Sequence, residues 1–164
     1  EVAAGRTAAA RAAAQQMAAH YQRAEALARA AGSAGWFYPA LNGLAAELLA
    51  HVDTPKWPGF DPARVAELRQ TLETQRRDAP DFWSVVGLPE LAMLDALARG
   101  DLHRQLPAIT AVYEDLHQRA GTAWMWASVA DQAGFVLPRF ANAGGPQAAA
   151  ARELLQTLRR FADG

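Results

Sequence analysis

Apolar residues recur along most of the chain at steps of three and four positions, the spacing that places side chains on one face of an α-helix. The most regular stripe consists of Leu102, Leu106, Ile109, Val112 with Tyr113, and Leu116. Glycine, proline and aspartate interrupt this pattern at intervals, so it predicts seven separate helices. Their expected ranges are 6–31, 36–52, 62–78, 82–99, 102–120, 123–141 and 146–161.

The residues between the predicted helices are typical of helix ends. Asp61, Asp81 and Asp101 each precede a helical pattern and are expected to cap it, while Gly32 follows the first one as a C-terminal signal. Residues 53–60 contain two prolines and a glycine, and therefore form an irregular loop in which Trp57 and Phe60 are expected to pack onto the helices.

The fourth predicted helix contains Gly87 and Pro89, so we expect it either to kink or to split into two pieces. The stripe of the fifth helix is expected to be buried against the fourth and sixth helices. Four acid–base pairs at i,i+4 are expected to mark solvent-facing sides of the helices. They are Glu25–Arg29, Glu73–Arg77, Asp95–Arg99 and Asp115–Arg119.

Composition supports an all-α fold. The 164 residues include 40 alanines and 18 leucines but only one isoleucine, Ile109, so helix formers dominate and β-branched residues are scarce. We expect residues 1–164 to form a single all-helical domain. Residue 1 is Glu and not Met, and we interpret the chain as part of a longer protein.

Short glycine-containing turns predict antiparallel helical hairpins. The block 18–51 contains one such hairpin and has the 34-residue period of the tetratricopeptide repeat. Tyr21, Ala24 and Leu27 fit the second helix of one repeat, and Leu41, Leu44, Ala45 and Leu48 fit the first helix of the next. We therefore expect stacked antiparallel hairpins, a TPR-like α-solenoid; the alternative is an irregular helical bundle.

Two short segments resemble a known class of domain. The run from Trp36 to Asn42, Trp-Phe-Tyr-Pro-Ala-Leu-Asn, follows Tyr21-Gln22-Arg23-Ala24, and Trp126-Ala127-Ser128-Val129 follows Gly121. They resemble segments of degenerate tetratricopeptide-like domains in bacterial multidomain signalling proteins, related to the TRAFs-binding domain beside the kinase domain of apoptosis signal-regulating kinases. The loop at 53–60 departs from a regular repeat array. The resemblance implies a regulatory scaffold beside effector domains, with no catalysis of its own.

Charge and cysteine content exclude several classes of function. The formal net charge is −1, which gives no electrostatic basis for binding nucleic acid or an anionic membrane. The absence of cysteine excludes disulfides, thiolate catalysis and cysteine-ligated metals, and fits a cytoplasmic protein. No apolar stretch reaches the length of about 18 residues expected of a transmembrane helix.

Catalytic and metal-binding patterns are weak. No two of the four histidines, His20, His51, His103 and His117, stand at i,i+4, and Glu114-x-x-His117 occurs once where a di-iron bundle needs two copies. Neither a nucleophile elbow nor a phosphate loop is present, and Ser128 is expected to hydrogen-bond back to its own helix. We expect no metal, no cofactor and no enzymatic activity.

The aromatic residues are the strongest indication of a binding surface. Five tryptophans are many for a helical domain of this size, and tryptophan is enriched in binding hot spots. The candidate partner-binding residues are Tyr38, Asn42, Glu47, Trp57 and Trp124. The alternative role of Tyr38 and Asn42 is to lock neighbouring helices together.

The sequence thus predicts a non-enzymatic, TPR-like interaction or regulatory module that binds a partner protein or an adjacent domain of its own chain. The rival hypothesis is a helical ligand-binding or enzymatic domain with a central pocket lined by Trp and His. Convergence of three histidines, or of two with Glu114, would favour the rival. The oligomeric state cannot be read from the balanced charge pattern.

Overall fold

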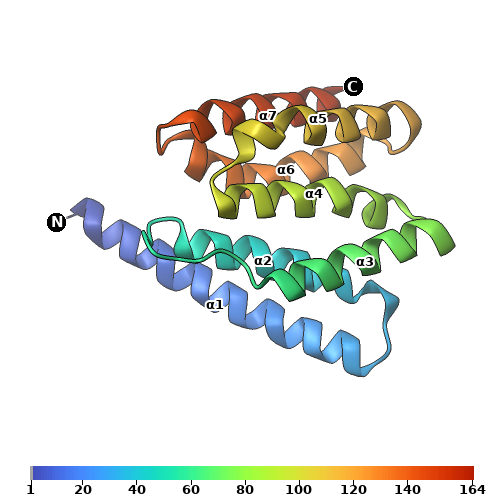
Figure 1. Cartoon of the computed structure of the whole chain (residues 1–164), viewed down its shortest axis with the longest axis horizontal. Helices are drawn as coiled ribbons and strands as arrows, with labels where there is room; N and C mark the ends of the chain where they lie inside the picture. The colour runs from blue at the N-terminus through green and yellow to red at the C-terminus, as the bar shows by residue number, and fades with distance from the viewer. Residues whose placement is uncertain (1) are drawn as a thin grey trace. The chain divides into compact units, whose positions relative to one another are not determined.

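A computed structural model describes residues 2–164, with side chains from residue 5 onward. In this part of the chain the fold is all-helical, with seven α-helices, one short 3-10 helix and no strand, which confirms the expected fold class and helix number. The elements, shown in Figure 1, are α1 (Val2–Ala30), η1 (Ala34–Trp36), α2 (Phe37–His51), α3 (Pro62–Asp78), α4 (Phe82–Arg99), α5 (Leu102–Arg119), α6 (Ala123–Ala141) and α7 (Pro146–Asp163).

Two of the three expected aspartate caps form. The Asp61 carboxylate accepts a hydrogen bond from the Ala63 backbone N–H at 3.0 Å, and Asp81 accepts one from the Ser84 N–H at 2.8 Å. Asp101 occupies the N-cap position of α5, but its side chain makes no capping hydrogen bond. The Asp61 and Asp81 side chains therefore cap the N-termini of α3 and α4, whereas the N-terminus of α5 has no such side-chain cap.

Helix α4 is one continuous helix across Gly87 and Pro89, so of the two expected outcomes the split does not occur. Gly87 lies close to two leucine side chains: a Cβ atom there would lie 3.0 Å from Leu72 Cδ2 and 3.2 Å from Leu41 Cδ1. These distances are tighter than most real Cβ contacts, so a larger residue would require the ends of the two leucine side chains to shift, and Gly87 lets α4 pack closely on α2 and α3.

The chain divides into two compact units, Glu1–Gly87 (unit 1) and Leu88–Gly164 (unit 2), and the boundary falls within α4. The sequence had predicted one domain over 1–164. Each unit is described here by itself.

In unit 1, α1 and α2 pack along their length as an antiparallel hairpin, and α3 packs on α2 (Figure 1). The loop between α2 and α3 is held by aromatic contacts: Trp57 stacks on His51 at 5.0 Å between ring centroids, and Phe60 is buried. This confirms the expected packing of the loop. Lys56, the single lysine of the chain, is exposed in the same loop.

In unit 2, α6 and α7 form the closest hairpin, and the nearest backbone neighbour of α5 is α7. The expected packing of α5 against the sixth helix is supported by side-chain contacts, since the rings of Tyr113 and His117 lie 6.4 and 5.3 Å from the Trp126 ring of α6, whereas α7 was not expected as a partner. The expectation is wrong at one position, because Val112 is 46% exposed, whereas its neighbour Tyr113 is buried. The Gln147 side chain fixes the start of α5 by accepting a hydrogen bond from the Leu102 N–H and donating one to the Leu97 carbonyl.

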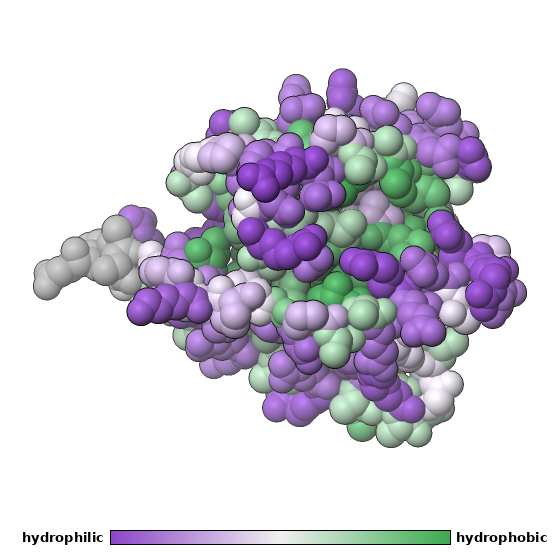
Figure 2. Space-filling model, in the orientation of Figure 1, coloured by the Kyte–Doolittle hydropathy of each residue, from purple (hydrophilic) through white to green (hydrophobic). Residues whose placement is uncertain are grey.

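Figure 2 shows hydrophilic residues over most of the face turned to the viewer, with small apolar areas between them. Among the described residues, no helix is both long enough and apolar enough to cross a bilayer.

Candidate functional site

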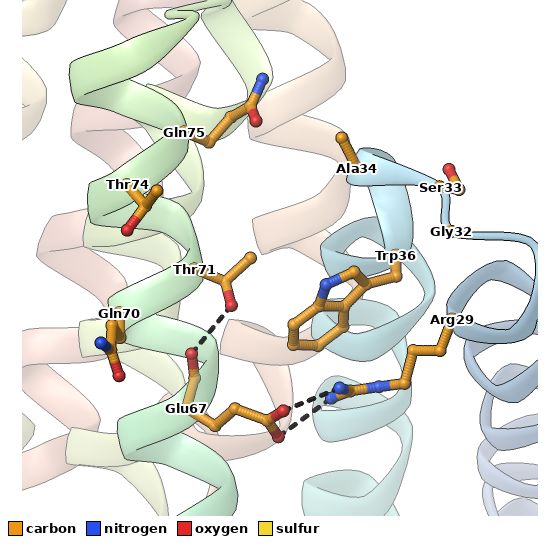
Figure 3. Close-up of a pocket in the computed structure, with 10 residues that line it drawn as sticks. All are labelled: Arg29, Gly32, Ser33, Ala34, Trp36, Glu67, Gln70, Thr71, Thr74 and Gln75. Atoms are coloured by element: carbon orange, nitrogen blue, oxygen red, sulfur yellow. Dashed lines mark hydrogen bonds and ion pairs between the residues drawn. The ribbon is translucent and has the colours of Figure 1, made fainter.

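An open cleft of about 610 Å³ lies in unit 1, between the end of α1 with the turn that follows it and one side of α3 (Figure 3). Its lining contains both charged and uncharged polar side chains and one aromatic ring. The residues are Arg29, Gly32, Ser33, Ala34 and Trp36 on one side, and Glu67, Gln70, Thr71, Thr74 and Gln75 on α3.

The turn that forms one wall is specified locally. Gly32 has a φ of +64°, a left-handed conformation that favours glycine. The Ser33 N–H donates to the Ala28 carbonyl and the Gly32 N–H to the Arg29 carbonyl, the hydrogen-bond pattern of a Schellman C-cap. The Ser33 hydroxyl then accepts a hydrogen bond from the Gly35 N–H and starts η1. The consequence is that Trp36 stands beside the end of α1.

Arg29 connects the two walls of the cleft. Its guanidinium donates to both oxygens of Glu67 at 2.7 and 3.0 Å, donates to Glu25 at 3.0 Å, and lies 3.4 Å from the centre of the Trp36 ring. The dashed lines in Figure 3 mark the Glu67 contacts. The hydrogen bonds that Arg29 donates to Glu67 raise the pKa of Arg29, and the same bonds lower the pKa of Glu67. Such bidentate pairs fix the position of both partners.

A second arginine extends this arrangement. Arg64 donates to Glu25 at 3.0 Å and to Glu47 at 3.2 Å, and burial raises the pKa of Glu47. Glu25, Arg29, Glu47, Arg64 and Glu67 together form the α1–α3 ion-pair network. Its three carboxylates and two guanidiniums connect α1, α2 and α3, and so hold the cleft walls in place.

The network corrects one prediction from the sequence. The expected Glu25–Arg29 pair forms, but Glu25 is buried and does not mark a solvent face. The pairs Asp95–Arg99 and Asp115–Arg119 also form, whereas Arg77 bonds to its neighbour Asp78. Arg77 therefore pairs with the adjacent residue Asp78, at the C-terminal end of α3, in place of the expected Glu73.

Helix α3 contributes the uncharged polar groups of the cleft. Thr71 and Gln75 project towards the side of the cleft that holds Trp36 and Ala34 (Figure 3). Both donate within their own helix region, Thr71 to the Glu67 carbonyl and Gln75 to the Ala79 carbonyl. Gln70 and Thr74 make no side-chain hydrogen bond within the described part of the chain. Their amide and hydroxyl groups are therefore open to an incoming ligand.

Three of the sequence-predicted binding residues lie on α2, outside this lining. Tyr38 is 39% exposed and stacks on Phe37, and burial of its ring, with the nearby Asp81 charge, raises its pKa to about 12. Asn42 is one turn further and half-buried. Glu47 is nine residues from Tyr38, about half a turn away around the helix, and bonds to Arg64. The structure therefore groups Tyr38 with Asn42 and separates Glu47 from them.

The two predicted tryptophans lie elsewhere. Trp57 is partly buried in the α2–α3 loop, where its ring contacts His51 and Phe60. Trp124 is in unit 2, near the start of α6, and is 61% exposed. Neither residue lines the cleft.

The residues that do line the cleft were not selected from the sequence. Arg29 and Glu67 are 38 positions apart, so no local pattern pairs them. A usable signal was present in α3, where the uncharged polar residues Gln70, Thr71, Thr74 and Gln75 repeat at helical spacing on a face without apolar residues. A second signal was Trp36, placed directly after a glycine-rich turn.

Unit 2 holds a carboxylate that the sequence analysis also missed. Glu90 on α4 is half-buried and accepts a long hydrogen bond from Gln132 at 3.4 Å. Burial raises its pKa to about 7. Tyr113 is buried near it, and burial together with the Glu90 charge raises the pKa of Tyr113 well above its usual value.

The histidines occur in separate surroundings. His20 contacts Arg23, His51 stacks on Trp57, and His117 stacks on Phe161 at 4.2 Å. The Nδ1 atom of His103 is buried and has no hydrogen-bond partner in the described structure. Within residues 2–164 no group of three or more His, Asp or Glu side chains is arranged to hold a metal ion.

Comparisons of this chain with protein-family models, with curated protein sequences and with solved structures give no significant match.

Proposed function

We propose that this chain is a non-enzymatic protein-interaction or regulatory module, and that the cleft of unit 1 binds an extended segment of a partner protein or of an adjacent domain of the same polypeptide. The observation that carries the proposal is the open cleft itself, whose α3 wall carries two exposed polar side chains, Gln70 and Thr74, that make no side-chain hydrogen bond within the described structure. The proposal does not extend to nucleic acid or membrane.

The order of the helices supports a TPR-like arrangement as the scaffold. Helices α1 and α2 form one antiparallel hairpin in unit 1, and α6 and α7 form another in unit 2. Consecutive antiparallel hairpins are the building blocks of helical repeat proteins, which present binding surfaces along their helices. The repeat architecture is part of the proposal, as is its similarity to bacterial signalling scaffolds.

The chemistry of the cleft suits a peptide main chain. A glutamine amide and a threonine hydroxyl can each donate and accept, so Gln70 and Thr74 can pair with peptide C=O and N–H groups. Trp36 adds an aromatic surface of the kind enriched in binding hot spots. Because the α1–α3 ion-pair network already fixes both walls, binding orders few protein groups and loses little conformational entropy.

The rival hypothesis, an enzymatic or ligand-binding pocket lined by Trp and His, has less support. The cleft contains one tryptophan and no histidine, and it is open to solvent. His51 and His117 are packed against aromatic rings, and Glu114 is exposed on α5. These positions favour the interaction module.

The proposal is tested by selecting peptides from a random displayed library on the full chain and measuring their affinity by calorimetry. We expect the double variant Gln70→Ala, Thr74→Ala to bind selected peptides at least about tenfold more weakly, a loss of about 1.4 kcal/mol. Its melting temperature should be unchanged, because both side chains lack intramolecular hydrogen bonds. The Trp36 indole resonance should shift on peptide addition.

Two further variants provide controls. Gln156→Ala removes an exposed amide from α7 and should leave affinity unchanged. Tyr38→Ala, Asn42→Ala tests the α2 pair predicted from the sequence: loss of binding with an intact fold would move the site to α2, whereas lower stability with retained binding would assign the pair a structural role. Selected peptides that bind the Gln70, Thr74 variant as tightly as the native chain would contradict the cleft assignment.

A further inference from the structure

One face of α6 in unit 2 exposes two large aromatic side chains. Trp124 is 61% and Phe135 is 49% exposed, and Ser128 and Asp131 lie exposed between them. The four residues stand at i, i+4, i+7 and i+11, which places them along one side of the helix. The opposite side of α6 is buried and contains Trp126, Val129, Ala133, Val136, Leu137 and Phe140.

Along this outer face an aromatic residue stands at each end, and Ser128 and Asp131 stand between the two at matching distances from the centre. If a second α6 lies antiparallel across it, a two-fold axis midway between Ser128 and Asp131 places Trp124 of each copy opposite Phe135 of the other. The same axis places Ser128 of each copy opposite Asp131 of the other. Trp124 and Phe135 are about 16 Å apart along the helix, so both pairs of contacts form in one register.

Each of these contacts is favourable, and each occurs twice. Aromatic pairs gain energy beyond the area that they bury. A serine hydroxyl donating to a carboxylate forms a charge-assisted hydrogen bond. In the described structure, neither Ser128 nor Asp131 makes a side-chain hydrogen bond or ion pair, so the back-bond expected for Ser128 does not form.

We infer that the face of α6 formed by Trp124, Ser128, Asp131 and Phe135 is a self-association surface, and that its occupant is the same face of a second copy of this chain. An isologous two-fold contact requires a surface that is complementary to itself. This face is complementary to itself because the two-fold axis pairs aromatic rings with aromatic rings and a hydroxyl donor with a carboxylate acceptor. Four partly exposed aromatic rings bury only several hundred Å², so the dimer is at the weak, reversible end of protein association.

Sedimentation equilibrium of the full chain tests the inference. Over concentrations from ~5 to ~500 µM, the average mass should rise from 17.6 kDa towards twice that value, with a micromolar dissociation constant. Ser128→Asp places a carboxylate opposite Asp131 of the other copy, and should weaken association at least about tenfold. Because position 128 is exposed, its melting temperature should stay within a few degrees of the native value.

A charge-complementation experiment tests the register. Asp131→Lys provides an ammonium opposite the new carboxylate, so labelled Ser128→Asp chain should associate when Asp131→Lys chain is added, although it does not associate with itself. Gln156→Glu on α7 is the matched control, because it changes net charge by the same amount as Ser128→Asp at another exposed position. It should self-associate as the native chain does.

Three results would overturn the inference. The first is a native chain that stays monomeric over the whole concentration range, as expected if a different protein covers this face. The second is Ser128→Asp association equal to native. The third is an equal loss of association in Gln156→Glu, which would show that net charge and not this face controls the equilibrium.

Discussion

Glu90 is a residue whose proton equilibrium depends strongly on the fold. Its pKa is raised from 4.5 to about 7 by burial. Between these two pH values the folded chain keeps a proton that the unfolded chain has released. The free energy of unfolding therefore falls as the pH rises through this range, and the carboxylate destabilises the fold fully above pH 7.

Glu90→Gln should remove this pH dependence. The amide stays neutral and can still pair with Gln132, so we expect a gain in stability of up to about 3 kcal/mol at about pH 8 and little change at about pH 4.5. Urea unfolding of both chains at the two pH values measures this. Glu114→Gln, at an exposed position on α5, should change stability by no more than about 0.5 kcal/mol. An equal effect of Glu90→Gln at both pH values would contradict the assignment.

Sequence reasoning at the scale of residues succeeded where the cause is local. Asp61 and Asp81 were identified as caps because a cap needs only the next two or three backbone N–H groups. It failed for Glu90, because nothing adjacent in the sequence shows how deeply that position on α4 is enclosed. The Arg29–Glu67 contact was missed for the same reason: it depends on how α1 and α3 pack.

At the scale of elements, α5 shows which buried residues helical periodicity predicts correctly and which it does not. The stripe correctly selected Leu102, Leu106 and Ile109 as buried. Of the next pair, Val112 with Tyr113, the helix turns Tyr113 inward and exposes Val112, because the alternating steps of four and three that connect Leu102, Leu106 and Ile109 continue to position 113. The packing of α5 on α7 could not be predicted, since a stripe defines a face but not what covers it.

The α5 face predicts a contrast between two neighbouring positions. Ile109→Ala should lower the free energy of unfolding by about 2–5 kcal/mol, because it empties a buried site. Val112→Ala, one turn further at a half-exposed position, should change it by less than about 0.5 kcal/mol. Thermal melts of the two variants and the native chain, followed by circular dichroism, measure this contrast in stability. Similar melting temperatures for both variants would mean that the buried face of α5 is misplaced.

On the scale of the whole molecule, the sequence predicted the class and the order of helices but not their grouping. Seven helices followed from turn residues and apolar spacing, which are local signals. The division into two compact units at Gly87 did not, because the boundary falls inside one continuous helix, α4, where Gly87 and Pro89 indicated a kink or a split of the helix and not a boundary between units. The cleft of unit 1 forms where α1, η1 and α3 pack together, so local sequence signals could not predict it either.

The assembly of unit 1 depends on the α1–α3 ion-pair network, and Arg64 is its central cation. Arg64→Leu would leave Glu47 without its partner and the buried Glu25 with Arg29 alone. We expect a loss of about 1–3 kcal/mol in stability, since a buried charge loses its compensation. Arg119→Ala breaks the exposed pair with Asp115 and should cost no more than about 1 kcal/mol. Urea unfolding of the two variants gives the comparison, and equal losses would mean that the network contributes no more than a surface pair.

Lys56 makes the chain simple to modify at a known place. Apart from the terminal amine, it is the single primary amine of the protein, and it is exposed in the α2–α3 loop. It is neither a lining residue of the cleft nor part of α6. An amine-reactive dye or a sensor surface therefore attaches at Lys56 or at the terminal amine, and leaves the side chains of both proposed binding surfaces unmodified. In a two-fold dimer, a cross-link between two side-chain amines can join only Lys56 to its own copy, so each cross-linker length reports one side-chain distance.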